Sequence, residues 1–275
     1  MPKKIVMRFL TQSSCIVLAL LIVISALLGI SCLSGRSLTD HSDVVANGLD
    51  YLKNAEAADA SAGDSVFFQR KAEREKLAQQ QRDKEQLIYD INHDNVDIYS
   101  LFKDYAILGD SRALGFSHFR YLDYSRVFAA GGDTILNVRD HIDKLKKLNP
   151  TYIYLCYGVN DAGIQIWKTP EKYAAQVLEI LSELQAALPD SKIMLNSTIW
   201  ISEGAARKFT PWAQIYDFSA ACKVMCQENG FQFIDNDEIC LALKENKWWS
   251  GDGIHLLRPF YKLWAKNMFL ATLED

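Results

Sequence analysis

A serine, and a histidine with an acidic neighbour, are the residues of this chain best suited to chemistry. Ser111 follows the apolar run 107–109 and Asp110, and His255 closes the segment Asp252-Gly253-Ile254-His255. A serine hydroxyl attacks a carbonyl at a useful rate only when a base takes its proton, and the base works best when a third group holds its tautomer. Both helpers occur in one short segment, so the pattern indicates acyl-transfer chemistry.

Short apolar runs alternate with amphipathic stretches from residue 105 to the C-terminus. The apolar runs predict strands at 105–109, 126–130, 152–157, 192–198 and 231–234. The amphipathic stretches predict helices at 113–121, 136–148, 170–188, 212–229 and 258–273. This succession predicts an α/β domain with a mostly parallel sheet of about five strands and helices on both faces. In such sheets, sites form where the chain leaves the carboxyl ends of the strands.

The polar residues that an acyl-transfer site needs lie in four loops. Ser111 follows the first predicted strand, Gly131 and Gly132 follow the second, and Asn160 follows the third. The fourth loop, 251–255, precedes the last predicted helix. Glycine lets a backbone N–H group approach a ligand closely, which suits the second loop to binding an oxyanion.

Together these loops resemble the sequence blocks of the SGNH, or GDSL-type, serine hydrolase family of esterases and lipases. The four matches are Gly109-Asp110-Ser111 for the nucleophile block, Gly132 for the glycine block, Gly158-Val159-Asn160-Asp161 for the asparagine block and Asp252-x-x-His255 for the acid and base block. Any one match is weak, but four in the family's order, each beside a predicted strand or helix end, make the resemblance specific.

The resemblance implies a three-layer, flavodoxin-like fold with a shallow site. Ser111 would be the nucleophile, His255 the general base and then the general acid, and Asp252 the group that orients His255. The oxyanion hole would consist of the backbone N–H groups of Ser111 and Gly132 and the side-chain amide of Asn160. The chemistry requires no metal and no organic cofactor.

Each of these residues also has an ordinary structural explanation. Ser111 could cap a helix, His255 could be a structural histidine, and Asn160 with Asp161 could form a turn. Their joint occurrence favours the catalytic interpretation. Asp161 is expected to brace its loop and not to react.

The cysteines beyond the N-terminal region suggest no dense disulfide framework. They are Cys156, Cys222, Cys226 and Cys240. Cys222 and Cys226 are one helical turn apart with no nearby histidine, which makes a weak metal site. Buried, small apolar side chains are the favoured interpretation.

Two residues are candidate substrate contacts. Arg112 follows Ser111, where the family usually has an aliphatic residue. Its cation could lower the pKa of Ser111, bind an anionic substrate or point into solvent, and the last is favoured because charged side chains are usually solvated. Trp200 could pack against the face of a sugar ring, with core packing as the alternative. It lies in the connection 199–210, which is expected to form a wall of the acyl or sugar pocket.

The N-terminal region predicts a membrane segment. Lys3, Lys4 and Arg8 precede an almost purely apolar stretch over 15–33, which as a helix would be roughly 28 Å long, enough to cross a bilayer. The charge asymmetry predicts a cytoplasmic N-terminus and an extracytoplasmic remainder. An uncleaved signal anchor is favoured, while a cleaved signal peptide and a lipoprotein signal ending at Cys32 remain alternatives.

These observations divide the chain into three parts. Residues 1–34 form the membrane segment, 35–103 an extracytoplasmic tether with a charged helix, and 104–275 the SGNH-like domain. The stretch 34–62 has little periodicity and suits a tether. Residues 70–85 mix both charges with strong helix formers, which predicts an exposed helix. Its apolar positions sustain no heptad repeat, so a long coiled coil is not expected.

Composition limits the possible partners. The formal net charge of -4 provides no basic surface for phosphates, so nucleic acid is not an expected partner. We expect a membrane-tethered extracytoplasmic serine esterase that removes a small acyl group, acetyl first, from a carbohydrate or cell-wall glycan through an acyl-enzyme on Ser111. A glycan O-acyltransferase with the same triad, a lipid esterase or thioesterase, and a non-catalytic glycan-binding module remain alternatives.

Overall fold

The structure, a computed structural model, describes residues 42–274 of the chain. Two compact units meet in sequence between Gln79 and Gln80. The predicted membrane segment over 15–33 lies outside the described residues. Within residues 42–274, no helix is long and apolar enough to cross a membrane.

The described chain begins with one long helix, α2 (Ser42–Asn92), of 51 residues. Pairs one turn apart, such as Lys71 with Glu75 at 3.9 Å, lie on its exposed surface, so the predicted exposed helix over 70–85 is confirmed. The stretch 34–62, whose low periodicity suited a tether, is helical from residue 42 onward. That stretch is rich in alanine and contains no proline, and helix propensity does not require an apolar face.

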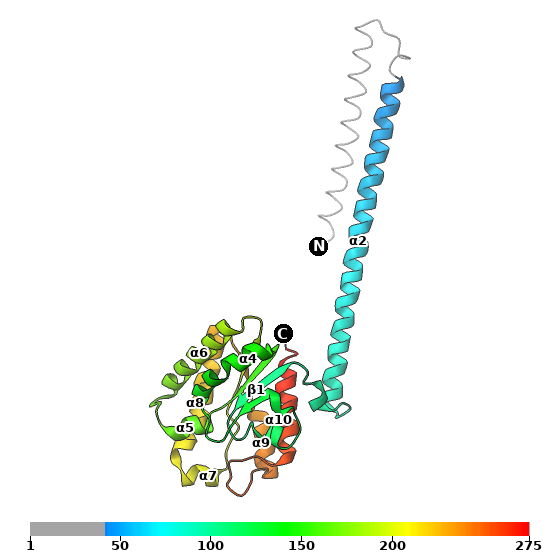
Figure 1. The fold of residues 1–275 in the computed structure, drawn as a ribbon. Helices are drawn as coiled ribbons and strands as arrows, with labels where there is room; N and C mark the ends of the chain where they lie inside the picture. Colours follow the sequence, from blue (N-terminus) through cyan, green and yellow to red (C-terminus); the bar gives the residue numbers. More distant parts are fainter. Residues whose placement is uncertain (1–41, 275) are drawn as a thin grey trace, which may run out of the picture. The chain divides into compact units, whose positions relative to one another are not determined.

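Five strands form one sheet, and the strand predictions are confirmed with shorter ends (Figure 1). The strands are β1 (Tyr105–Gly109), β2 (Val127–Ala129), β3 (Tyr152–Cys156), β4 (Lys192–Asn196) and β5 (Gln232–Ile234). All four pairings are parallel, in the order β2-β1-β3-β4-β5. This is the flavodoxin-like order, in which the chain switches direction across the sheet between β1 and β3.

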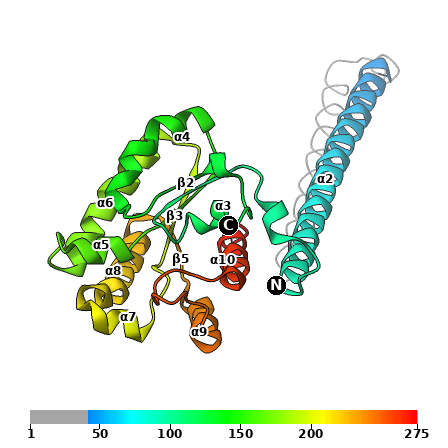
Figure 2. The same cartoon turned by 60° about the horizontal axis from the view of Figure 1, so that its bottom comes forward.

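Helices cover both faces of the sheet. The main ones are α3 (Gly115–His118), α4 (Ile142–Leu148), α6 (Pro170–Ala187), α8 (Ile215–Asn229), α9 (Asp237–Asn246) and α10 (Arg258–Ala271). Figure 2 shows α4, α6 and α8 on one side of the strands and α3 and α10 on the other. Helix α6 begins where the N-cap Thr169 accepts from the Lys172 backbone N–H and Pro170 occupies the first turn.

Two predicted helices are interrupted, and three helices were not predicted: α5 (Val159–Ile164), α7 (Glu203–Lys208) and α9. The stretch 113–121 contains only the four residues of α3, and 136–148 begins as a 3-10 helix (Ile135–His141) before α4. Helix α9 has only Cys240 and Leu243 as buried residues, so its apolar periodicity is weak in the sequence. The predictions over 170–188, 212–229 and 258–273 are confirmed as α6, α8 and α10, the second after a 3-10 turn (Thr210–Gln214).

Each face of the sheet has its own apolar core. Leu145, Leu181 and Phe218 from α4, α6 and α8 belong to one. The other contains side chains of α3, α9 and α10, and also Ile91 and Ile98 from the chain before β1. The compact unit therefore begins at Gln80, earlier than the expected domain start at residue 104.

Candidate active site

Strand β1 delivers Ser111 to the carboxyl edge of the sheet. All five residues of β1 are buried, and its last residue, Gly109, pairs with Ala129 of β2 and Cys156 of β3. A Cβ atom on Gly109 would lie 2.6 Å from the Cys156 carbonyl oxygen, so this tight turn requires glycine. The loops after β1, β2 and β3 therefore emerge side by side, at the switch point where parallel sheets form their sites.

Ser111, His255 and Asp252 form a continuous hydrogen-bonded chain. Ser111 Oγ lies 2.9 Å from His255 Nε2, and His255 Nδ1 lies 2.5 Å from Asp252 Oδ2. Ser111 and His255 are 144 positions apart in the sequence. The side chains of His255 and Asp252 are 48% and 44% exposed, so the site is open to solvent.

The environment of Asp252 determines the tautomer of His255. Partial burial raises the pKa of Asp252, but hydrogen bonds from Ser250 Oγ, the His255 ring and the backbone N–H groups of Ile254 and His255 outweigh it and hold the pKa well below its usual value. An ionised carboxylate can only accept, so His255 Nδ1 carries the proton. Nε2 of the neutral ring is then free to accept the proton of Ser111.

The loop that contains Asp252 and His255 is held at both ends. It connects α9 to α10 (Figure 2), and an isolated antiparallel bridge joins Trp249 to Leu256 across its base. The Ser250 backbone N–H donates to the His255 carbonyl at 2.8 Å, and the Ser202 N–H donates to the Gly253 carbonyl at 2.8 Å. Ser250 was not identified from the sequence. Its only sequence signal is its position two residues before Asp252.

The predicted oxyanion-hole residues lie in the neighbouring loops. Gly132 is exposed and has φ +89°, in the left-handed region, and space is open where a Cβ would lie. Asn160 is in the first turn of α5 (Val159–Ile164), and its Nδ2 donates to the Asp133 carbonyl at 2.9 Å. That bond uses one of the two amide hydrogens, which leaves the other as a donor for an oxyanion.

Asp161 braces these two loops. Its side chain is fully buried, and Oδ1 accepts from the Ile135 backbone N–H at 2.9 Å. Burial raises the pKa of Asp161 to about 7, against a smaller lowering by the Ile135 N–H. Asn160 and Asp161 thus bind the loop after β2 at adjacent points, Asp133 and Ile135.

The expectation that Arg112 points into solvent is wrong. Its side chain is 2% exposed, and its guanidinium pairs with Asp110 at 3.3 Å. Nη1 also donates to the Ile199 carbonyl at 2.7 Å, while the Arg112 carbonyl accepts from the Tyr261 hydroxyl. The turn after β1 directs Arg112 into the interior, where Asp110 neutralises the charge, so its side chain does not line the site as a substrate contact.

The Trp200 side chain forms no hydrogen bond with a triad residue among the described residues. Its indole N–H donates to Asp237 Oδ1 at 3.1 Å, and its ring meets Tyr216 edge-on at 5.8 Å. These three residues line a separate cavity of about 280 Å³ to which no triad residue contributes. The connection 199–210 does approach the triad loop, through the bond from Ser202 to Gly253.

The four described cysteines are free thiols and all are buried, as preferred for Cys156. Burial raises the pKa of Cys222 and Cys240, the latter to about 12, which keeps both protonated. Among residues 42–274, no three or more His, Cys, Asp or Glu side chains are grouped as metal ligands.

The model of the GDSL-like lipase/acylhydrolase family matches residues 107–263. A search of curated protein sequences gives no significant match.

Several solved structures are similar in fold. A protein described as a GDSL-like lipase, from Parabacteroides merdae, is 19% identical with a TM-score of 0.51, covering 62% of this chain and 95% of that one. A lipase/acylhydrolase from Enterococcus faecalis is 17% identical with a TM-score of 0.45, covering 62% and 96%. An acetyl xylan esterase from Geobacillus stearothermophilus is 14% identical with a TM-score of 0.46, covering 62% and 94%.

Proposed function

This chain belongs to the GDSL-like lipase/acylhydrolase family and is an ester-hydrolysing enzyme, and we propose that it removes a small acyl group, acetyl foremost, from a carbohydrate or cell-wall glycan. The observation that carries this proposal is the hydrogen-bonded chain from Ser111 through His255 to Asp252. It joins a nucleophile, a base and an orienting carboxylate, which is the set of groups that acyl transfer requires.

The proposed reaction proceeds through an acyl-enzyme. Ser111 Oγ attacks the ester carbonyl while His255 Nε2 takes its proton, and the carbonyl oxygen becomes an oxyanion. The backbone N–H groups of Ser111 and Gly132 and the Asn160 amide stabilise that charge. The intermediate collapses, the C–O bond to the sugar breaks, and His255 returns the proton to the leaving hydroxyl. Water, deprotonated by His255, then attacks the acyl-enzyme carbonyl, the bond to Ser111 Oγ breaks, and His255 returns the proton to Oγ as the acid leaves.

The openness of the site supports a small acyl group on a large, polar alcohol. His255 and Asp252 are each almost half exposed, so a bulky polymer can reach the nucleophile and water can reach the acyl-enzyme. A long acyl chain would instead need an extended apolar channel to remove it from water. Access of water also favours hydrolysis over transfer to a second glycan hydroxyl.

The proposal includes a membrane tether at the N-terminus. The apolar stretch over 15–33, preceded by Lys3, Lys4 and Arg8, supports an anchor with the domain outside the cytoplasm, where acylated glycans occur. Full-length protein should stay with membranes after alkaline carbonate washing, whereas a variant lacking residues 1–34 should be released. Release of both proteins alike would refute the anchor and leave the esterase proposal intact.

Replacing Ser111 tests the activity. Ser111→Ala in the full-length, detergent-solubilised chain should abolish p-nitrophenyl acetate hydrolysis and labelling by a fluorophosphonate probe. Ser125→Ala is the matched control, because Ser125 is exposed and its hydroxyl hydrogen-bonds only to Asp123 among the described residues. Undiminished turnover by Ser111→Ala would refute the proposal. Appearance of acylated oligosaccharide in place of free acid would identify an acyltransferase.

A further inference from the structure

A cavity of about 370 Å³ opens beside the triad loop, on the side of Asp252. The residues that matter among those lining it are Ser202, Lys208, Lys247, Trp249 and Asp252. They come from three segments: α7 (Glu203–Lys208) with its N-cap, the end of α9, and the triad loop. One imidazole ring and two hydrogen bonds separate this Asp252 carboxylate from Ser111 Oγ.

The positive charges in this cavity are available to a ligand. Lys208 and Lys247 form no ion pair within the part of the chain that the structure describes, and both are exposed. The neighbouring cations differ, because Arg207 and Lys244 both pair with Glu203, at 3.6 and 3.1 Å.

Asp252, the acidic residue in the cavity lining, forms no ion pair with either lysine in the described part of the chain. Its Oδ1 accepts from Ser250 Oγ and the backbone N–H groups of Ile254 and His255, and its Oδ2 accepts from the His255 ring. Four donors satisfy the oxygens of this carboxylate. The cavity therefore combines two unpaired ammonium groups with an anion whose bonding is already complete.

Lys247 forms the C-cap of α9. Lys247 ends α9 with φ +53°, in the left-handed region where helix ends favour glycine or asparagine. Its backbone N–H caps the helix by donating to the Leu243 and Lys244 carbonyls, which glycine would do equally well without a strained Cβ. Gln165 adopts the same conformation at the end of α5, so it is the place of Lys247 in the cavity lining, together with its exposure, that suits it to binding a ligand.

Trp249 and α7 give the cavity a fixed form. The Trp249 indole N–H donates to the Trp200 carbonyl at 3.0 Å, which orients its ring, and the Ser202 N–H donates to Gly253 at 2.8 Å, which ties α7 to the triad loop. An aromatic ring beside two cations suits a sugar with an acidic substituent, since the ring packs on C–H groups and the ammonium groups bind the acid. The cavity and the triad are parts of one hydrogen-bonded unit.

We propose that Lys208 and Lys247 bind an anionic substituent, carboxylate or phosphate, on the acylated glycan whose ester Ser111 cleaves. This inference rests on the proposed esterase function and names the substrate class of the same site. The chain has a formal net charge of -4, which repels an acidic polymer at long range, so a local pair of cations is what such a substrate needs. Lys208 and Lys247 would thus perform the anion binding that was one of the alternatives for Arg112 in the sequence.

The test compares three acetylated substrates on the full-length enzyme: a xylo-oligosaccharide without charge, a galacturonate oligomer with carboxylates, and a glucose 6-phosphate acetate. Acetate release is measured, and kcat/KM for each anionic substrate is divided by kcat/KM for the neutral one. Lys208→Gln/Lys247→Gln should lower that ratio roughly tenfold, mostly through KM, as expected for two exposed ion pairs. The anionic substrate whose relative kcat/KM falls more identifies carboxylate or phosphate as the preferred group.

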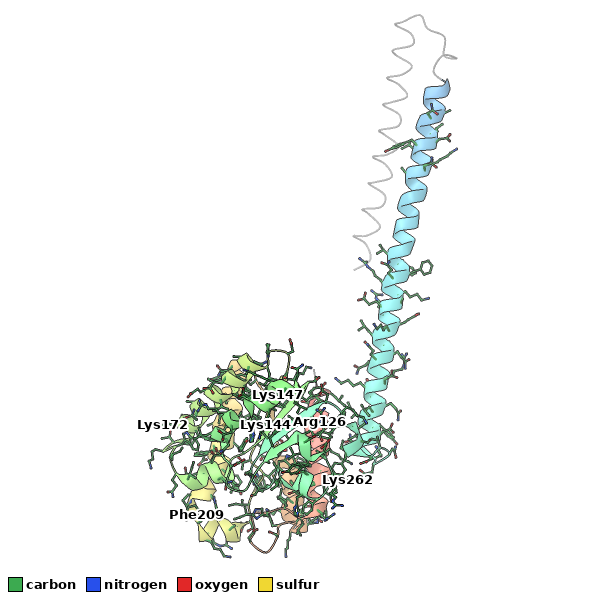
Figure 3. All side chains as sticks on the ribbon, viewed as in Figure 1. Arg126, Lys144, Lys147, Lys172, Phe209 and Lys262 are labelled. Carbon is green, nitrogen blue, oxygen red and sulfur yellow. The ribbon has the colours of Figure 1, made fainter. Side chains whose placement is uncertain are left out.

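The matched control is Lys144→Gln/Lys147→Gln, on the exposed surface of α4 (Figure 3). It removes the same charge and should leave the ratio unchanged. Both cavity lysines also stand at helix C-termini, where positive charge stabilises the helix, so a purely structural role predicts an equal loss on all three substrates. An unchanged ratio, whether or not the activity on all three substrates falls equally, would overturn the inference. So would a wild-type enzyme that cleaves only the neutral substrate. Failure to cleave any of the three would instead count against the proposed function.

Discussion

The guanidinium of Arg112 lies 3.3 Å from the Asp110 carboxylate in the domain interior, so the residue next to the nucleophile stabilises the turn and does not face substrate. Both side chains are only 2% exposed. Asp110 Oδ1 also accepts from the Arg112 backbone N–H at 2.9 Å, which closes a local turn around Ser111. The ion pair between Asp110 and Arg112 therefore stabilises the turn that carries Ser111.

Breaking this pair should destabilise the fold. Arg112→Met leaves the Asp110 carboxylate buried without its partner, which typically costs about 3–5 kcal/mol of unfolding free energy. Urea denaturation measures the loss. The double variant Asp110→Asn/Arg112→Met should recover part of the lost stability, because Asp110→Asn removes the unpaired buried carboxylate. Lys146→Met, on an exposed position, is the control, and equal stabilities of Arg112→Met and the control would contradict the buried-pair interpretation.

Replacing Asp252 should lower kcat more than replacing Ser250, which donates a hydrogen bond to Asp252. Asp252→Asn loses the charge that holds the His255 tautomer, and we expect kcat to fall roughly 10²–10⁴-fold with little change in KM. The lower end is favoured because the pair is almost half exposed. Ser250→Ala removes one of four hydrogen bonds to Asp252 and should cost less than about tenfold. Steady-state kinetics on p-nitrophenyl acetate would show the order, and a larger effect for Ser250→Ala would exclude it.

Asn160 should act on the transition state. Asn160→Ala removes one oxyanion donor, so kcat should fall about 10²–10³-fold while KM changes little. The same change also removes the bond to the Asp133 carbonyl and could loosen the loop. Asn137→Ala separates the two effects, because Asn137 caps that loop by accepting from the Thr134 N–H but is not a predicted oxyanion donor. Similar kcat losses in both variants would show that loop order, and not the amide donor, matters.

Burial of Asp161 should make stability depend on pH. Its pKa is raised from 3.8 to about 7, so the folded protein holds this proton more tightly than the unfolded chain does. The resulting stabilisation is complete below about pH 4, falls as the pH rises to about 7 and then levels off, by at most roughly 4 kcal/mol.

Asp161→Asn isolates this contribution, because an amide oxygen can still accept from the Ile135 N–H. Unfolding free energies of wild type and variant, measured between pH 4 and pH 8, should diverge in slope, with the variant losing less stability as pH rises. Parallel curves would mean that Asp161 does not titrate in this range.

The chain's own pattern determined the elements and the reactive residue types. Strand β1 has the predicted bounds because five apolar residues between polar turns are a local signal, and the remaining strands differ only at their ends. The parallel sheet follows from strands alternating with helices. Ser111, Asn160, Asp252 and His255 could be named because each occupies a strand or helix end within a short recognisable segment.

Tertiary structure alone decided where side chains point and which distant segments meet. The turn after β1 directs Arg112 inward, which no sequence spacing specifies, and Trp200 bonds to Asp237 and not to the triad. The cavity with Lys208 and Lys247 exists only because the ends of two helices pack beside the triad loop. Local sequence encodes backbone tendency and polarity, whereas the direction of a side chain and the distance across 144 residues depend on packing of the whole domain.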